Sequence, residues 1–143
     1  MKKTMTAAMA VKIYDILGNA SLSKMDDTGK FTIINAMRAL KPVATGLKDD
    51  ISDARKQLAP EDYNQILEMR YRYPLLSVEE RVEVSRVERE LESKVTECMS
   101  DELNREHSFE FTTMDKVAFG ALLASNDFNA ATMIELQDAL CEV

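Results

Sequence analysis

The sequence predicts a mainly helical protein, and three observations support that class. Apolar residues recur at alternating steps of four and three over 33–58, the spacing typical of helices that pack side by side. Charged residues make up 30% of the chain and hydrophobic residues 45%, a balance that suits long solvated helices. Four Gly and three Pro supply few of the turns that a sheet sandwich needs. A chain of 143 residues is expected to form a single helical domain, 1–143.

A short N-terminal helix is expected from about Thr4 to Leu17. Its apolar residues lie on one face, namely Met5, Met9, Ile13, Ile16 and Leu17. A helix of this length needs a neighbour to cover that face.

The next helix, 28–58, carries the most regular apolar stripe of the chain. This helix-association seam consists of Ile33, Met37, Leu40, Ala44, Leu47, Ile51, Ala54 and Leu58. Pro42 removes one intrahelical hydrogen bond and Gly46 lowers the helix propensity, but the seam keeps its phase across both residues. We therefore predict a kinked helix that does not stop.

A connector helix and a second long helix follow. Pro60 is typical of the first position of a helix, which predicts a short connector helix. Ser77 and Glu80 have the spacing of a capping box, which predicts the start of another helix over 77–104. Because the connector is short, the two long helices, 28–58 and 77–104, are expected to form an antiparallel hairpin.

After the second long helix the apolar period changes. Phe109 and Phe111 alternate with polar residues, which is typical of a short strand. This strand, 108–112, can pair with 71–75, which also alternates. Two short C-terminal helices complete the prediction, the first capped by Thr113 and the second by Asn129.

Composition restricts the classes of partner and compartment. Eighteen basic and twenty-five acidic residues give a net charge of -7, which repels a phosphate backbone, so nucleic acid is not an expected partner. No apolar stretch is long enough to span a membrane, and we expect no membrane association. Lys12 and Asp15 interrupt an N-terminal stretch that briefly imitates a signal peptide. Cys98 and Cys141 lack a disulfide pattern and are interpreted as reduced thiols of a cytoplasmic protein.

No group of side chains predicts catalysis. His107 is the only histidine, so a metal site that needs two histidines cannot be assembled. A pair of Cys98 and His107 is conceivable, but Cys98 lies on the predicted apolar stripe, where a small buried hydrophobe is the simpler interpretation. We expect a protein that is not an enzyme and has no cofactor, no metal and no small-molecule substrate.

Acidic residues at helical spacing are candidates for a cation site. They are the pairs Glu79 and Glu83, Glu88 and Glu92, and Glu97 and Asp101. Interleaved arginines favour a solvated face of ion pairs instead. The segment from Asp26 to Lys30 lacks the spacing of an EF-hand loop or a P-loop and is interpreted as a helix cap.

Basic and aromatic residues alternate in one segment that is a candidate for partner binding. Its residues are Arg70, Tyr71, Arg72 and Tyr73. Such side chains can stack on bases or hold an acidic partner. The alternative interpretation is that the tyrosines pack under the helical hairpin while the arginines face water.

The order of elements also carries a resemblance. The segments concerned are Ala10 to Leu17, Asn35 to Val43, Asp53 to Leu58, and Glu102 to Asn104 leading into the short strand. This order resembles small helical proteins of unknown function encoded by tailed bacteriophages and prophages. The resemblance implies a phage context, a place in the host cytoplasm or the virion, and a virion or assembly role. The resemblance assigns no functional residues, and the segment from Pro60 to Ser77 has no counterpart in those proteins.

Two hypotheses about function follow from the sequence. The first is a non-enzymatic structural or assembly protein that acts by helix-helix association, with itself as a homo-oligomer or with another helical protein. The alternative is a small binding module or regulator that contacts an acidic protein or nucleic acid through Arg70 to Tyr73.

Overall fold

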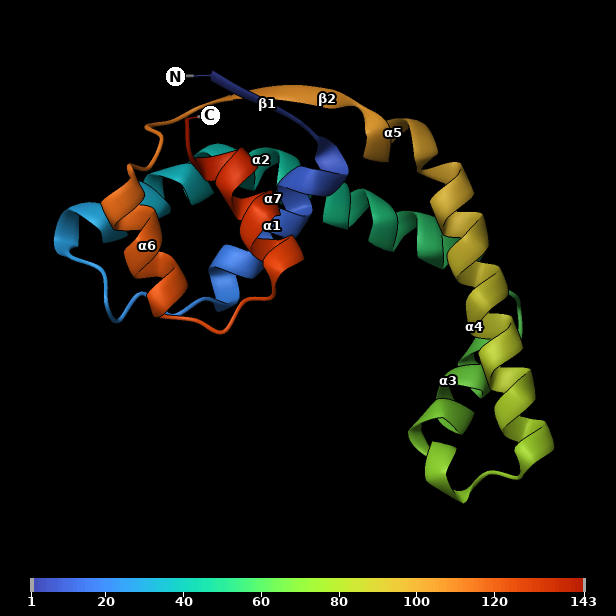
Figure 1. The fold of residues 1–143 in the computed structure, drawn as a ribbon. Coiled ribbons are helices and arrows are strands. Elements are labelled where there is room, and N and C mark those ends of the chain that lie inside the picture. Colours follow the sequence, from blue (N-terminus) through green and yellow to red (C-terminus); the bar gives the residue numbers. More distant parts are fainter. Residues whose placement is uncertain (1, 143) are drawn as a thin grey trace. The chain divides into compact units, whose positions relative to one another are not determined.

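The computed structural model describes residues 2–142 and is mainly helical (Figure 1). In chain order the elements are β1 (Lys2–Thr6), α1 (Ala7–Asn19), α2 (Asp27–Leu58), α3 (Tyr63–Tyr71), the 3-10 helix η1 (Tyr73–Leu75), α4 (Val78–Cys98), α5 (Ser100–Asn104), β2 (Glu106–Glu110), α6 (Lys116–Ala124) and α7 (Ala130–Leu140). The predicted class, mainly helical with one long helix and a minimal antiparallel sheet, is confirmed.

The chain divides into two compact units. Unit 1 contains the chain up to Lys48 and from Glu102 onward, and unit 2 is Asp49–Asp101. The long helix α2 contributes residues to both units.

Unit 1 has a single apolar core. Its most completely buried side chains come from α1, α2, α6 and α7, and they are Ile13, Ile33, Leu40, Leu122, Leu136 and Leu140. The aromatic side chains of Phe109 and Phe111 join the same core. The N-terminal half of the seam therefore packs against the helices of its own unit.

The sheet of unit 1 differs from the predicted pairing. β2 pairs antiparallel with β1, with Met5 opposite His107 and Lys3 opposite Phe109. The prediction that strand 108–112 pairs with 71–75 was wrong, because 71–75 lies in the end of α3 and in η1. Thr4 to Thr6, which were expected to begin the first helix, belong to β1, and the side chain of Thr6 caps α1 by accepting a hydrogen bond from the Met9 amide.

Helix α2 is continuous through Pro42 and Gly46, as its unbroken apolar phase predicted. Pro42 leaves the carbonyl of Arg38 without its intrahelical donor. Both residues are exposed, so water can satisfy that carbonyl and the helix need not end. At its start, Asp26 accepts a hydrogen bond from the Gly29 amide at 2.7 Å, which confirms the interpretation of this segment as a helix cap.

Unit 2 contains the end of α2 together with α3, η1 and α4. Its small core is formed where α3 packs on α4, from Ile66, Val84 and Val87. The predicted capping box is present: Ser77 accepts from the Glu80 amide, and the Glu80 carboxylate accepts from the Ser77 amide. The helix expected over 77–104 is interrupted at Met99, where α4 ends before α5 begins.

The C-terminal helices agree with the prediction in part. Asn129 caps α7, as expected, by accepting from the Thr132 amide. The cap of α6 is Asp115 and not Thr113. Met114 forms a parallel bridge with Cys141, which ties the segment before α6 to the end of the chain.

Candidate functional site

The helix-association seam was the first predicted site, and most of it is covered by the chain itself. Five of its residues are buried, namely Ile33, Leu40, Ala44, Leu47 and Ala54. The remaining three, Met37, Ile51 and Leu58, are half-buried. A second copy could reach the buried residues only by displacing the side chains that already cover them. Self-association through this seam stays a prediction.

The second predicted site, from Arg70 to Tyr73, lies at the turn between α3 and α4. Arg70 and Tyr71 end α3, and Tyr73 begins η1. Tyr71 is 89% exposed and Tyr73 39% exposed. The alternative in which both tyrosines pack under the helices was therefore wrong, because α3 directs only Ile66 and its neighbours toward α4.

Three further apolar side chains at this turn were missed by the sequence analysis. Leu75, Val78 and Val82 are 85%, 75% and 60% exposed. At 100° per residue, Val78 and Val82 lie on the face of α4 opposite Val84 and Val87. The available signal was that they fall out of phase with the buried stripe of α4. We call the exposed residues Tyr71, Tyr73, Leu75, Val78 and Val82 the turn surface.

The turn surface is held in place by hydrogen bonds from one arginine. Arg81 donates to the backbone carbonyls of Tyr73 at 3.1 Å and of Pro74 at 2.9 Å. Its guanidinium also lies 5.5 Å from the centroid of the Tyr73 ring. These contacts tie η1 to the first turns of α4, which the capping box already fixes. A surface ordered in this way loses less conformational entropy when a partner binds.

A shallow groove adjoins the turn surface between the end of α3 and α4. Its volume is about 500 Å³, and its lining residues are Arg70, Tyr73, Val84, Ser85, Glu88 and Arg89. We call it the arginine groove. Tyr73 belongs both to this groove and to the turn surface, so the two are continuous.

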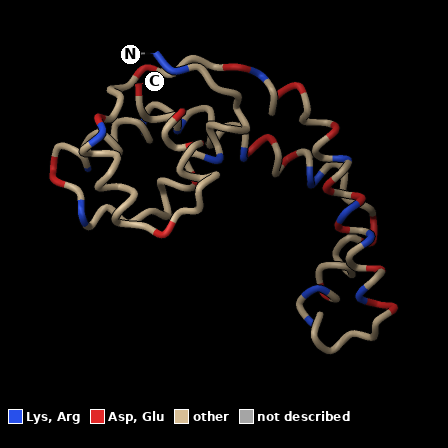
Figure 2. The backbone as a smooth tube through the Cα atoms, in the orientation of Figure 1, with Lys and Arg blue, Asp and Glu red and all other residues tan. Residues whose placement is uncertain are grey.

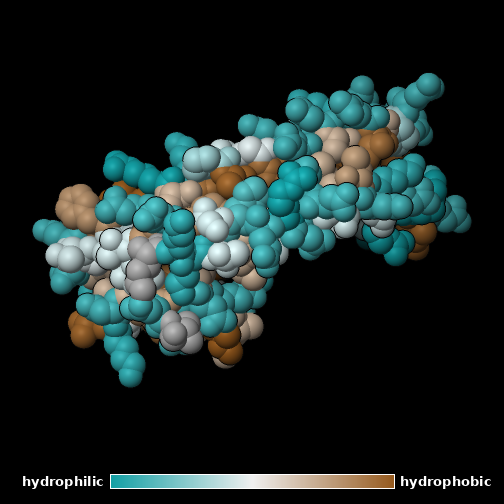
Figure 3. Space-filling view, turned by 90° about the horizontal axis from the view of Figure 1, so that it is seen from above, coloured by the Kyte–Doolittle hydropathy of each residue, from teal (hydrophilic) through white to brown (hydrophobic). Residues whose placement is uncertain are grey.

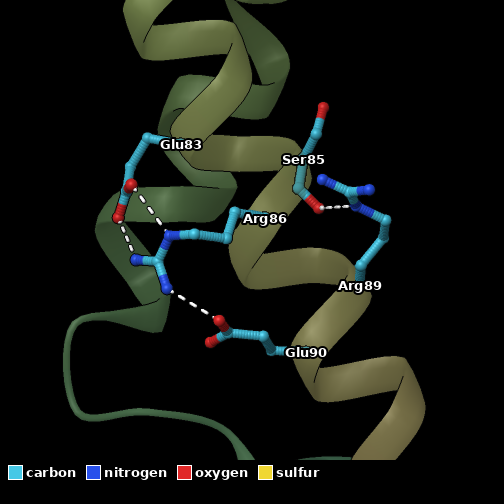
Figure 4. Close-up of polar contacts among 5 residues, drawn as sticks. All are labelled: Glu83, Ser85, Arg86, Arg89 and Glu90. Atoms are coloured by element: carbon cyan, nitrogen blue, oxygen red, sulfur yellow. Dashed lines mark hydrogen bonds and ion pairs between the residues drawn. The ribbon is translucent and has the colours of Figure 1, made fainter.

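The one carboxylate in the arginine groove is already engaged. Glu88 accepts from the Tyr63 hydroxyl, with oxygen-oxygen distances of 3.2 and 3.3 Å. Burial, followed by the charge and hydrogen bonding of Glu88, raises the pKa of Tyr63 above its ordinary value. Arg70 approaches Glu88 only at 3.8 Å and is 64% exposed. Arg89 donates to the carbonyl of Ser85 on its own helix (Figure 4).

The opposite flank of α4 contains a closed set of ion pairs. Arg86 binds the carboxylates of both Glu83 and Glu90 (Figure 4). The hydrogen bond from Arg86 lowers the pKa of Glu83, and the pKa of Arg86 is raised by both partners. In the same way Glu92 accepts from Arg55. Of the carboxylates suggested as cation ligands, Glu83 and Glu92 are thus paired with arginines, and no cluster of potential metal ligands occurs among residues 2–142.

The single histidine and the two cysteines occupy ordinary positions. His107 lies in β2 of unit 1, with its ring centroid 6.2 Å from that of Phe109. Cys98 is exposed at the end of α4, which corrects the expectation that it is a buried hydrophobe. Cys141 is buried, and this burial raises the pKa of its thiol.

Charge is distributed unequally along the chain. Unit 2 has fourteen acidic and eight basic residues, a net charge of -6, whereas the rest of the chain has a net charge of -1. Within unit 2, the ten residues 69–78 contain two arginines and no acid. In Figure 2, blue and red residues both occur along α4, while the turn that joins α3 to α4 has no acidic residue. The turn is the part of unit 2 that an acidic partner can approach with least repulsion.

Elsewhere the visible surface is mostly hydrophilic. Viewed from above, apolar residues form only small separate patches between charged and polar ones (Figure 3). Within the part of the chain that the structure describes, none of the helices combines the length and the apolar character needed to cross a bilayer.

Comparisons of the chain with protein-family models, with curated proteins and with solved structures found no match.

Proposed function

We propose that this protein is a non-enzymatic structural or assembly protein that acts by association, with the turn surface of unit 2 as its contact site. The observation that supports the proposal is the exposure of five large apolar side chains within twelve residues, on a turn ordered by Arg81 and by the capping box. Exposed apolar residues that cluster on an ordered element are typical of protein interaction sites.

The turn surface suits a partner better than the seam does. Its side chains are accessible in the folded chain, while most of the seam is buried. A second copy of unit 2 would bring another charge of -6 to the same place, which opposes self-association at low salt. The proposal therefore commits to another protein as the partner. The implied phage setting remains a proposal, and flanking capsid, portal or tail genes would support it.

Photocrosslinking in the cells that express the protein tests this proposal. A benzophenone amino acid replaces Leu75 in the turn surface or Val117 in unit 1, two positions that are 85% and 82% exposed. We expect one discrete adduct with another protein from position 75, and none from position 117. The adduct should disappear in the double variant Val78→Asp/Val82→Asp, whose folding is checked by circular dichroism.

Three outcomes would contradict the proposal. Equal crosslinking from Leu75 and Val117 would mean that exposure alone produces the adducts. An adduct that survives Val78→Asp/Val82→Asp would place the contact elsewhere. An adduct between two copies of the chain, confirmed by sedimentation of the purified protein, would restore the homo-oligomer in place of a different partner.

A further inference from the structure

We propose that the arginine groove binds an acidic segment of the partner protein, with carboxylates of that segment paired to Arg70 and Arg89. This inference rests on the proposed function and names the chemistry of the partner. It goes beyond the turn surface because it adds Arg89, a residue of α4 outside the segment predicted from sequence.

The guanidinium groups of Arg70 and Arg89 have weaker hydrogen bonds and ion pairs than those of two other arginines of unit 2. Arg86 is bound by two carboxylates, and Arg81 donates to two backbone carbonyls. Arg70 has one loose carboxylate contact at 3.8 Å, and Arg89 has one hydrogen bond of 3.4 Å to its own helix. Both can therefore form charge-assisted, bidentate hydrogen bonds to new carboxylates without losing strong ones.

The only acid among the residues that line the groove does not neutralise them. Glu88 keeps its negative charge but accepts from the Tyr63 hydroxyl, and its one carboxylate is opposed by two guanidinium groups. Two guanidinium groups and one carboxylate leave the groove locally positive within a unit of net charge -6. Tyr73 provides an aromatic wall where the groove meets the turn surface.

A short acidic protein segment fits this arrangement better than nucleic acid does. Duplex DNA carries one charge per about 1.7 Å, so its backbone would extend past the groove along carboxylates on α4. A peptide needs only two carboxylates at the groove, and it can place apolar side chains on the turn surface. Charge complementarity and apolar contact are then supplied together.

Fluorescence anisotropy with the full chain tests the inference. The probe is a labelled glutamate-rich peptide that contains two leucines, and the controls are the same peptide with lysine for glutamate and a labelled single-stranded oligothymidylate. We expect binding of the acidic peptide only, weakening as salt rises. Arg70→Ala/Arg89→Ala should weaken it by about tenfold to a hundredfold, whereas Arg86→Ala, on the opposite flank of α4, should have little effect.

The results separate this inference from the proposed function. If the acidic peptide fails to bind, or Arg86→Ala weakens binding as much as Arg70→Ala/Arg89→Ala, the binding of an acidic segment in the arginine groove is refuted. Tighter binding of oligothymidylate would show that the groove selects phosphates. In each of these cases an adduct from position 75 that depends on Val78 and Val82 would leave the proposed function standing. If position 75 gives no adduct with another protein even when Val78 and Val82 are unchanged, the proposed function is refuted.

Discussion

Unit 1 and unit 2 divide their apolar residues between core and surface in different proportions. The core cluster of unit 1 contains seventeen buried residues contributed by helices and strands from both ends of the chain. The α3–α4 core of unit 2 contains three, and five large apolar side chains of the same elements stay exposed. Unit 1 is nearly neutral, whereas unit 2 is strongly acidic except at its turn. Unit 1 thus buries most of its apolar side chains in one core, whereas unit 2 leaves a larger share of its large apolar side chains exposed.

The largest expected effect is the loss of stability when each core is truncated. Leu136→Ala in unit 1 should lower the free energy of unfolding by about 2–5 kcal/mol, because the cavity lies among side chains that are fully buried. Ile66→Ala in unit 2 should fall at the low end of that range, since its small cluster can collapse around the gap. Urea unfolding followed by amide hydrogen exchange measures each unit separately. A larger loss for Ile66→Ala would break the comparison.

The two thiols sharpen the same contrast, with one cysteine in each unit. Cys98 is exposed, while Cys141 is buried and its raised pKa disfavours the reactive thiolate. In native protein we expect iodoacetamide to alkylate Cys141 more slowly than Cys98, on the order of a hundredfold. Mass spectrometry of timed samples gives the two rates, and denaturant should make them similar. Equal native rates would mean that the core of unit 1 opens readily.

A smaller effect is expected from Tyr63 in unit 2. Because burial and Glu88 raise its folded pKa above the ordinary 10.0, the fold favours the neutral phenol. This contribution is fully present below pH 10 and is lost as the pH rises through the folded pKa. Urea unfolding at several pH values should show unit 2 losing stability above pH 10, and Tyr63→Phe should lose less. Identical slopes for both proteins would show that the hydrogen bond to Glu88 contributes nothing.

Much of the fold could be predicted because its signals are local. The capping box at Ser77, the cap at Asn129 and the unbroken phase of α2 each depend on residues within a few turns. The candidate segment from Arg70 to Tyr73 was found through its alternation. Val78 and Val82 were not found, because the apolar stripe that predicted α4 runs through Val84 and Val87 and both valines fall out of phase with it.

The partner of β2 illustrates what local patterns cannot supply. The predicted strand 108–112 was paired with 71–75 because that segment also alternates. The true partner, β1, lies about a hundred residues away in sequence. Such pairing depends on the approach of distant residues, which no short window of sequence records.

By itself, the sequence of this protein determined the starts of α4 and α7, the unbroken run of α2 and that most of the chain is helical, because caps and apolar periodicity act between neighbouring residues. Tertiary structure alone decided which apolar faces are covered. It buried the first half of the α2 seam inside unit 1 and left the turn surface and the arginine groove open to water, because burial depends on which distant elements supply the other side of each contact.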